Sequence, residues 1–275
     1  MTDLSGLRAV PLYTHVDRIA RSLAALGIGP DDTIPIDQLF ALDEWHYHGI
    51  DAIRDAAAFL AVGPTSRVLD IGAGVGGPAR FLAHTTGCHV TALELQPELH
   101  RVGFDLTRRC GLADRVTHVG GDALSAPLPA DAFDAVVSFL AILHMADRPA
   151  LTRRLPAVLR RGGRCYIEDL CQRAPFAPRD LEDLHTVVYG ITVTSIEDYA
   201  GDLHQAGLVD IVATDTTADW APFVAERLAN WRLDHAAYAA VHGEAAWEAQ
   251  DLFYSVVDRL YRGGLGGVRL TARRP

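Results

Sequence analysis

The stretch of sequence that decides the fold is Asp70-Ile71-Gly72-Ala73-Gly74-Val75-Gly76-Gly77. It follows a short apolar run, residues 67–71, which predicts a buried strand. It precedes residues 78–86, which predict a helix with Pro78 in its first turn. Glycines in such a turn let the backbone pass close to a ligand that lies over the helix N-terminus. The stretch therefore predicts a ligand-binding turn between a strand and a helix.

The chain after this turn continues the alternation of strands and helices. Further strands are predicted over residues 89–95, 115–119, 133–139, 164–169, 208–214 and 267–272, with helices over 97–110 and 149–159. The turn Arg160-Arg161-Gly162-Gly163 is expected to end the second of these helices. This alternation predicts an α/β fold, a mostly parallel sheet with helices on both faces.

Three segments lie outside the alternation. Residues 1–60 carry helical patterns and predict an N-terminal helical cap on a main domain of residues 61–275. Residues 171–195 form a long connection, and long connections in compact domains are usually functional. Residues 219–262 predict a pair of helices that breaks at His242-Gly243. We expect the last two segments to cover the substrate.

The glycines alone leave the ligand ambiguous. Gly72, Gly74 and Gly77 fit the dinucleotide pattern GxGxxG, whereas Gly72, Gly74 and Gly76 fit the pattern GxGxG. Asp70 ends the first strand, where its carboxylate would repel the pyrophosphate of a dinucleotide and attract a cationic cofactor. This acid favours a cofactor with an ammonium and a sulfonium group.

Two more acids follow the next strands. Glu94 ends the second strand 22 residues after Gly72 and is placed to bind both ribose hydroxyls of a nucleoside, which suits either kind of cofactor. Asp122, with Ala123, follows the third strand, where an acid can accept a hydrogen bond from an adenine amino group. The three acids together indicate an adenosine cofactor without phosphates.

Two motifs carry a resemblance to a known family. Residues 68–83, VLDIGAGVGGPARFLA, resemble the first motif of the class I S-adenosylmethionine-dependent methyltransferases. The Gly-Gly-Pro-Ala-Arg ending is similar to the branch of sarcosine/dimethylglycine, sterol, tocopherol and prenyl-diphosphate C-methyltransferases. Residues 134–147, with Leu143-His144 and Asp147, resemble the fourth-strand segment of that branch, S-x-x-x-x-LHxxD.

The resemblance covers residues 60–170, with a weaker match near the C-terminus. It implies a Rossmann-like seven-stranded sheet in the order 3-2-1-4-5-7-6 with the seventh strand antiparallel, and S-adenosylmethionine as the cofactor. The cofactor-binding residues that we expect are Asp70, Gly72, Gly74, Gly76, Glu94, Leu95, Asp122, Ala123 and Ser138.

The residues after Ser138 depart from the family pattern. Relatives that methylate polar amines tend to carry Gln-Asp or similar there, whereas this chain has Phe139 and Leu140. An apolar wall argues against sarcosine-like substrates and for a larger, partly apolar acceptor. We expect the acceptor to contact Phe139, Leu140, Trp45, Tyr47 and Tyr13, with Trp220 as a further candidate for the wall.

The candidate catalytic residues lie at the same edge of the sheet. His144 follows the fourth strand, and Glu168 and Asp169 end the fifth, at the side where open α/β sheets bind ligands. His46 lies in the cap. Each of these groups can take a proton or orient an acceptor. The alternatives are a structural hydrogen bond for His144, a helix cap or a solvated acid for Glu168 and Asp169, and simple packing of an amphipathic helix for the segment that contains His46.

Composition restricts the partners. The net charge of −10 and the lack of a basic run argue against a nucleic-acid substrate. The start of the chain has no signal-peptide pattern, and no stretch reaches the ~18 apolar residues that span a bilayer, so we expect a cytoplasmic protein without a membrane partner. A homodimer is compatible with these features.

A metal site is not expected. The four cysteines, Cys88, Cys110, Cys165 and Cys171, form no CxxC pair. His46 and His48 are two residues apart, and on a helix such residues point to different faces.

Taken together, the motifs predict a methyltransferase that acts on a small, partly apolar metabolite or natural product, at a carbon, nitrogen or oxygen atom. The alternatives are an NAD-dependent oxidoreductase and a non-catalytic cofactor-binding protein.

Overall fold

The computed structural model describes residues 17–43 and 45–275. The strands of the described chain are β1 (Arg67–Ile71), β2 (His89–Glu94), β3 (Val116–Gly120), β4 (Phe133–Phe139), β5 (Leu159–Gln172), β6 (Val209–Asp215) and β7 (Leu265–Arg273). They form one sheet in the order β3-β2-β1-β4-β5-β7-β6. The first five strands are parallel, and β7 runs antiparallel to both of its neighbours. This is the order that the family resemblance implies.

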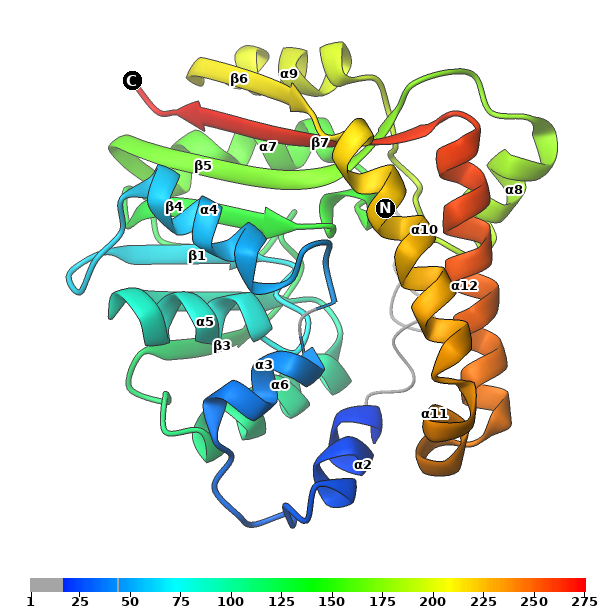
Figure 1. Cartoon of the computed structure of the whole chain (residues 1–275). Helices are drawn as coiled ribbons and strands as arrows, with labels where there is room; N and C mark the ends of the chain where they lie inside the picture. The colour runs from blue at the N-terminus through cyan, green and yellow to red at the C-terminus, as the bar shows by residue number, and fades with distance from the viewer. Residues whose placement is uncertain (1–16, 44) are drawn as a thin grey trace.

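The helices cover both faces of this sheet and one end of it (Figure 1). They are α2 (Asp17–Ala25), α3 (Ile36–Asp43), α4 (Ile50–Leu60), α5 (Gly77–Thr86), α6 (Pro97–Arg109), α7 (Arg148–Val158), α8 (Pro178–Thr186), α9 (Ile196–Gln205), α10 (Thr217–Leu233), α11 (His235–His242) and α12 (Glu244–Arg262), with a 3-10 turn η2 (Ile142–His144). Figure 1 shows α10 and α12 side by side, facing the end of the sheet where the parallel strands finish.

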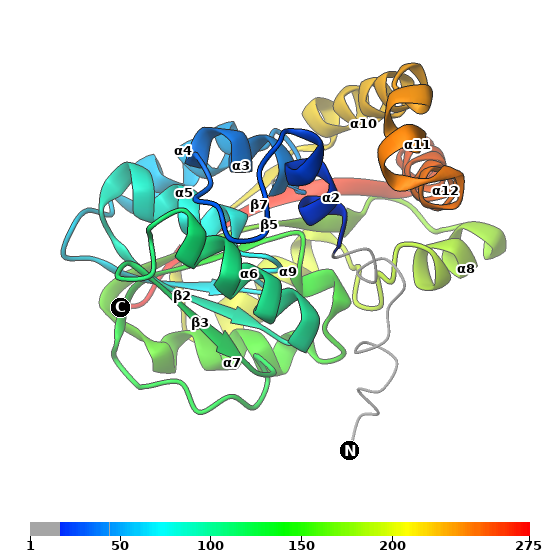
Figure 2. The ribbon, with the colours of Figure 1, turned by 90° about the horizontal axis from the view of Figure 1, so that it is seen from below.

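The alternation of side chains along each strand divides the core into two layers. In β4, Ala135 and Val137 pack with residues of α4 and α5, whereas Val136 packs on the other face with residues of α7 and α9. Figure 2 shows α4 and α5 on one side of the sheet and α7 and α9 on the other. The predicted α/β class is confirmed. Although α4 lies inside the predicted cap of residues 1–60, it packs on the sheet itself.

The earliest described helices, α2 and α3, pack on α6 rather than on the sheet. A buried ion pair of 2.5 Å joins Asp43 at the end of α3 to Arg80 in α5. Arg80 also donates to Thr107 Oγ1 in α6, at 3.0 Å. Removal of one partner from a buried pair leaves an uncompensated charge, which is strongly destabilising. This contact therefore fixes α3 beside the start of α5.

The predicted end of the helix at residues 149–159 is wrong in detail. The helix ends at Val158, and Arg160-Arg161-Gly162-Gly163 belongs to the beginning of β5. The register shifts there, because Leu159 pairs with Phe133 whereas Arg164 pairs with Ala135. The extra residues form a bulge in the strand.

The fifth strand is also much longer than the predicted residues 164–169. Its last residues, 170–172, pair with residues 265–267 of β7. The predicted connection of residues 171–195 therefore begins inside a strand, and it contains α8. Its later part is fixed to η2, since Ile191 N and Thr192 N donate to Leu143 O at 2.9 and 3.1 Å.

The segment of residues 219–262 contains three helices instead of the predicted pair. The predicted break at Gly243 is present, with φ 90°, and a second break falls at Asp234 between α10 and α11. Within the described residues, no helix combines the length and the apolar character needed to cross a membrane.

Candidate active site

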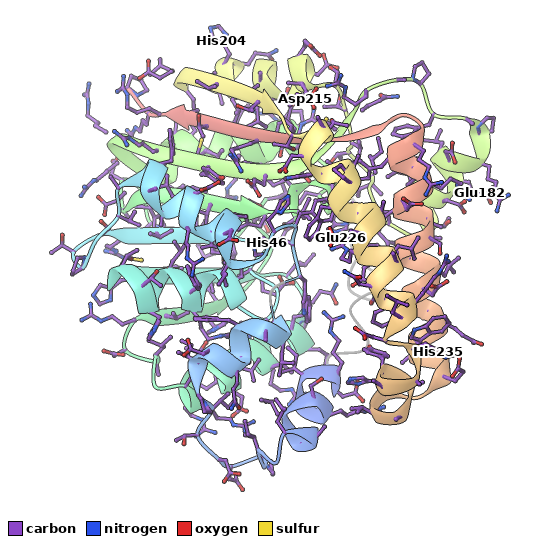
Figure 3. The ribbon with its side chains drawn as sticks, viewed as in Figure 1. His46, Glu182, His204, Asp215, Glu226 and His235 are labelled. Carbon is purple, nitrogen blue, oxygen red and sulfur yellow. The ribbon has the colours of Figure 1, made fainter. Side chains whose placement is uncertain are left out.

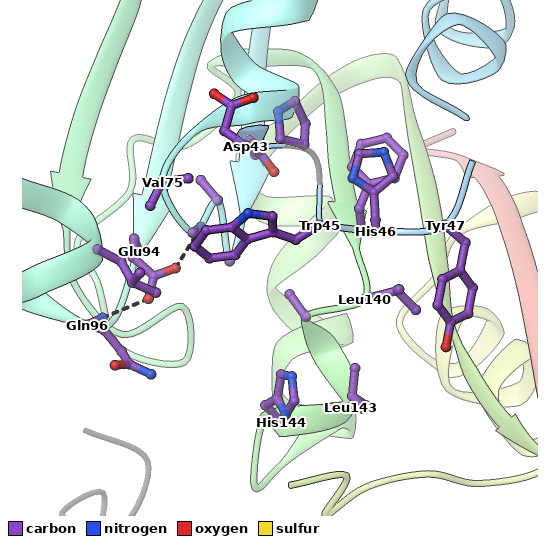
Figure 4. Close-up of a pocket in the computed structure, with 18 of the residues that line it drawn as sticks. Asp43, Trp45, His46, Tyr47, Val75, Glu94, Gln96, Leu140, Leu143 and His144 are labelled. Atoms are coloured by element: carbon purple, nitrogen blue, oxygen red, sulfur yellow. Dashed lines mark hydrogen bonds between the residues drawn. The ribbon is translucent and has the colours of Figure 1, made fainter. Parts of the chain in front are cut away.

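A cavity of about 700 Å³ lies between the ends of the parallel strands and the helices α10 and α12. This is within the range of small-molecule sites. Its walls come from the glycine-rich turn, the ends of β2 and β4, the loop after β3, the residues after α3, and the inner faces of α10 and α12. Figure 4 shows Glu94 and Gln96 at one side of this cavity and Tyr47 at the other.

The glycine-rich turn brings the backbone into the cavity wall. Gly72 and Gly74 both have positive φ, 74° and 56°, and both line the cavity. A Cβ atom on Gly72 would lie 2.4 Å from Cβ of Ala141, so no side chain fits there. At Gly74 a Cβ would meet no atom of the described protein within 4 Å. The turn thus leaves space for a ligand directly above its backbone.

Gly76 does not line the cavity, so its assignment to the cofactor site is not supported by its position. It precedes α5 with φ 83°, and a Cβ there would lie 2.7 Å from Cε1 of His118. Glycine adopts this left-handed backbone conformation without strain, and its missing side chain leaves room for His118.

Asp70 ends β1 below this turn, with 1% of its surface exposed. No group of the described protein donates a hydrogen bond to its buried Oδ2 atom. Burial, and then the neighbouring charge of Glu94, raises the pKa of Asp70 to about 7. A buried carboxylate oxygen without a donor is costly, and a cation or N–H donor of a ligand would offset that cost.

Glu94 is held in place by the backbone. Its Oε2 accepts a hydrogen bond from Gly74 N at 2.9 Å, and its Oε1 accepts one from Gln96 N at 2.8 Å. Each oxygen of a carboxylate can accept a second hydrogen bond, and Glu94 lines the cavity. The carboxylate is thus oriented before any ligand binds.

The other expected cofactor residues divide into two groups. Leu95, Asp122 and Ala123 line the cavity. Ser138 does not: it is fully buried, and its hydroxyl donates to Ile71 O at 2.9 Å. This hydrogen bond links β4 to the end of β1. Ser138 was expected to bind the cofactor, but the structure does not place it in the cavity wall.

Two of the expected catalytic residues line the cavity, His144 and His46. His144 Nδ1 lies 2.9 Å from Tyr189 O, and His46 Nε2 lies 2.9 Å from Gly49 O. Because a carbonyl only accepts, each of these ring nitrogens is the donor. Burial lowers the pKa of His144 and lowers the pKa of His46 to about 4. Both rings are therefore neutral at pH 7, each with a defined tautomer.

Glu168 is not brought to the cavity. Its Oε1 accepts hydrogen bonds from the Tyr166 hydroxyl at 2.9 Å and from Arg269 Nε at 2.8 Å. Asp169 is likewise buried, and its Oδ2 accepts from the Tyr199 hydroxyl at 3.1 Å. Both acids thus have partners within the protein, and neither lines the cavity.

The expected substrate wall is partly present. Phe139, Leu140, Trp45 and Tyr47 line the cavity, and the His46 ring lies 4.9 Å from the Phe139 ring. Figure 3 shows His46 near the centre of the molecule, between the sheet and α10. Trp220 packs behind Tyr47, with ring centroids 4.8 Å apart, and does not reach the cavity. Tyr13 lies outside the described residues.

The sequence analysis missed several wall residues on the helices. They are Arg18 in α2, Phe223 and Arg227 in α10, and Gln250, Phe253, Tyr254 and Val257 in α12. Their spacing of three or four residues puts those of each helix on one face. That spacing is visible in the sequence, but it does not show which face meets the cavity.

The raised pKa of Asp70 gives a prediction for stability. The native state binds the Asp70 proton more tightly than the unfolded chain does, so this group's contribution to the free energy of unfolding is fully present below pH 4 and is lost as the pH rises to about 7. Asp70→Asn should therefore be more stable than the wild type at pH 8, by a few kcal/mol at most, and should match it near pH 4.

Urea unfolding at pH 4, 6 and 8 measures this difference. Asp169, whose pKa burial also raises to about 7, contributes the same trend to both proteins, so the difference between them reports on Asp70 and on its interaction with Glu94. Parallel pH profiles for the two proteins would show that Asp70 is not strained by burial.

Comparison with known proteins finds a methyltransferase domain in this chain. Residues 69–167 match a family described as "Methyltransferase domain". The chain is 28% identical over 200 residues to a phosphoethanolamine N-methyltransferase of Triticum aestivum, an alignment that covers 73% of this chain and 39% of that protein. It is 28% identical over 227 residues to the 27-O-demethylrifamycin SV methyltransferase of Amycolatopsis mediterranei, covering 80% and 81%.

Among solved structures, Haemonchus contortus phosphoethanolamine N-methyltransferase 2, in complex with phosphomonomethylethanolamine and S-adenosylhomocysteine, has a TM-score of 0.78 at 21% identity. The alignment covers 84% of this chain and 54% of that one. The chain thus spans about two fifths to one half of the length of these phosphoethanolamine methyltransferases. The family match shows a methyltransferase domain over residues 69–167. The sheet order and the glycine-rich turn are those that the resemblance to class I S-adenosylmethionine-dependent methyltransferases implies.

Proposed function

We propose that the protein transfers a methyl group from S-adenosylmethionine to a small, partly apolar acceptor. The observation that carries the proposal is the buried Asp70 carboxylate, which lines the same cavity as Glu94 and whose Oδ2 has no donor within the described chain. A cofactor with an ammonium and a sulfonium group suits this pair of acids, since opposite charges attract strongly in a site of low dielectric.

The residues present fit the whole cofactor. Asp70 and the backbone beside Gly74 would hold its amino-acid part, where the open space above Gly74 admits a ligand. Glu94 would accept hydrogen bonds from the ribose hydroxyls, and Asp122 with Ala123 would bind the adenine. When bound, S-adenosylmethionine supplies an electrophilic methyl group on a sulfonium that leaves readily. The protein's own part is to align the acceptor and exclude water.

The two alternative functions, an NAD-dependent oxidoreductase and a non-catalytic cofactor-binding protein, have less support. A dinucleotide would bring its pyrophosphate to the turn beside Asp70, where the carboxylate repels it. The relatives are named as methyltransferases, which favours an enzyme over a non-catalytic binding protein.

His144 is the best-placed residue to act on the acceptor. With its Nδ1 proton donated to Tyr189 O, the basic nitrogen of the ring is Nε2. The low pKa keeps the ring neutral, so it can accept a proton or a hydrogen bond from an acceptor hydroxyl or amine. Neither Glu168 nor Asp169 lines the cavity, so His144 is proposed as the group that orients or deprotonates the acceptor. His46, which stacks near Phe139, is proposed as part of the acceptor wall.

The wider setting remains a proposal. The rifamycin-related relative supports a natural-product acceptor, hence a role in secondary metabolism. The charge of −10 supports a small molecule over a nucleic acid. We further propose a cytoplasmic protein in which the cap of residues 1–60 and the segments 171–195 and 219–262 cover the acceptor. A homodimer stays a prediction.

Glu94→Ala tests the cofactor assignment. The change removes hydrogen bonds to a charged group, each worth roughly 1.5–3 kcal/mol, so the affinity for S-adenosylmethionine should fall at least about tenfold. Calorimetric titration of the whole chain measures it. Glu98→Ala is the matched control, because Glu98 is an exposed acid in the next helix and should leave the affinity unchanged. A folded Glu94→Ala protein within about twofold of the wild type would refute the assignment.

His144→Ala tests the proposed catalytic role. Loss of a general base typically lowers turnover by about 10²–10⁴-fold, whereas cofactor affinity should not change because the cofactor residues lie elsewhere in the cavity. A role in positioning alone would lower turnover less and raise KM for the acceptor. Glu168→Gln, checked for folding, is the comparison, since Glu168 lies outside the cavity and its variant should keep wild-type turnover per folded molecule.

The measurement is transfer of labelled methyl to an accepted substrate. Equal turnover per folded molecule in His144→Ala and the wild type would mean that His144 only supports the structure.

A further inference from the structure

The charged groups of the cavity differ in whether they have a partner. The acids Asp70, Glu94 and Asp122 lie at the ends of the strands, where the cofactor is proposed to bind. Two further lining acids already have an arginine partner, since Asp43 pairs with Arg80 and Asp51 pairs with Arg54. Two arginines line the cavity from the helices instead: Arg18 in α2 and Arg227 in α10. Neither forms an ion pair with any carboxylate in residues 17–43 and 45–275. Both arginines are half-buried, and a charge that is partly withdrawn from water gains from an anionic partner.

Arg227 is surrounded by aromatic rings. Its guanidinium carbon lies 4.7 Å from the centroid of Tyr47, 4.7 Å from that of Tyr254 and 5.5 Å from that of Phe223. These ring faces stabilise the positive charge, and a side-chain hydrogen bond also links Arg227 to Tyr47. The buried Nε atom of Arg227 has no hydrogen-bond partner in the described chain. The surrounding rings therefore hold the guanidinium in one orientation, while its Nε–H has no hydrogen-bond acceptor among the described residues.

Arg18 belongs to the same part of the wall. Its guanidinium carbon lies 3.9 Å from the centroid of the Trp45 ring. Burial lowers the pKa of Arg18, while Tyr254 and Tyr238 act electrostatically in the opposite direction. An arginine remains charged under such a shift. Tyr254 is thus the neighbour that Arg18 and Arg227 share.

The aromatic rings could also be read as a cage for a cationic acceptor. Arg227 already occupies the faces of Tyr47 and Tyr254, and its charge repels an ammonium group placed there. A planar guanidinium instead matches carboxylate and phosphate oxygens with two parallel hydrogen bonds. The wall favours an anion at this end of the cavity.

We propose that the methyl acceptor is an amphiphile whose anionic group, a carboxylate or a phosphate, is bound by Arg227 and Arg18. Its apolar body then lies against Leu140, Leu143 and Val257, which line the space between the arginines and the strands. The proposal rests on the proposed function and names the class of its substrate. Both anions share the chemistry that a guanidinium recognises, and the experiment separates them.

Calorimetry with octyl phosphate, octanoate and octanol tests this site on the whole chain saturated with S-adenosylhomocysteine. We expect one or both anions to bind at least about tenfold more tightly than octanol, and the tighter anion identifies the headgroup. Arg227→Met keeps the length of the side chain and should lower the affinity for that anion about tenfold or more, without changing the affinity for octanol. The affinity of Arg227→Lys for that anion should lie between those of the wild type and Arg227→Met, because lysine keeps the charge and loses the paired donors.

Arg232→Met is the matched control. Arg232 lies in the same helix, pairs with Asp251 at the surface and does not line the cavity, so its variant should bind all three probes as the wild type does. Arg18→Met gives a second, independent test if Arg227→Met does not fold.

Three results would overturn the inference: neither anion binds, octanol binds as tightly as the anions, or the arginine variants weaken all three probes alike. The preceding titration with S-adenosylhomocysteine reports separately on the proposed function. If that nucleoside binds and the anions fail, only the anion site is refuted. If the nucleoside itself does not bind, the proposed function fails.

Discussion

The reversal of the chain at residues 72–76 is the constraint on which this edge of the molecule depends. Gly72 N and Ala73 N both donate to Leu93 O, at 2.9 and 3.0 Å, so the turn is tied to the end of β2. On its other side, Gly72 approaches Ala141 so closely that a methyl group would not fit. The ends of β1, β2 and β4 meet only because this backbone has no side chain there. The glycine-rich turn, the end of β2 and the residues after β4 therefore lie together in the wall of the cavity.

The same junction buries two acids that the protein alone does not neutralise. Asp70 and Glu94 lie close enough that the charge of Glu94 contributes to the raised pKa of Asp70, after the larger effect of burial. Backbone donors stabilise the Glu94 carboxylate, whereas Asp70 Oδ2 receives none from the described residues. Such strain is typical of a site whose ligand supplies the missing charge. At the far end of the cavity, Arg227 is a positive group whose buried Nε has no hydrogen-bond acceptor among the described residues.

Much of the fold was predictable because it depends on local patterns. β1 and β4 have the bounds that their apolar runs predict, and α9 begins one residue after the end of the predicted connection. β5 was predicted too short because its first residue pairs with β4 and its last residues pair with β7, about a hundred residues away. Of the proposed site, Asp70, Glu94 and His144 could be predicted because each lies at the end of a strand or shortly after it. Gly76 and Ser138 match the motif but serve packing, and Arg227 could not be found, because helical spacing does not say which face meets the cavity.

The central claim is that this turn and its acids accept a cationic nucleoside and reject a dinucleotide. Calorimetric titration of the whole chain at pH 8 with S-adenosylmethionine and, separately, with NAD tests it most directly. At that pH Asp70 is ionised, since its pKa lies at about 7. The account predicts saturable binding of S-adenosylmethionine and none of NAD at the same concentrations. Binding of NAD as tight as that of S-adenosylmethionine, or no binding of S-adenosylmethionine by the folded protein, would contradict it.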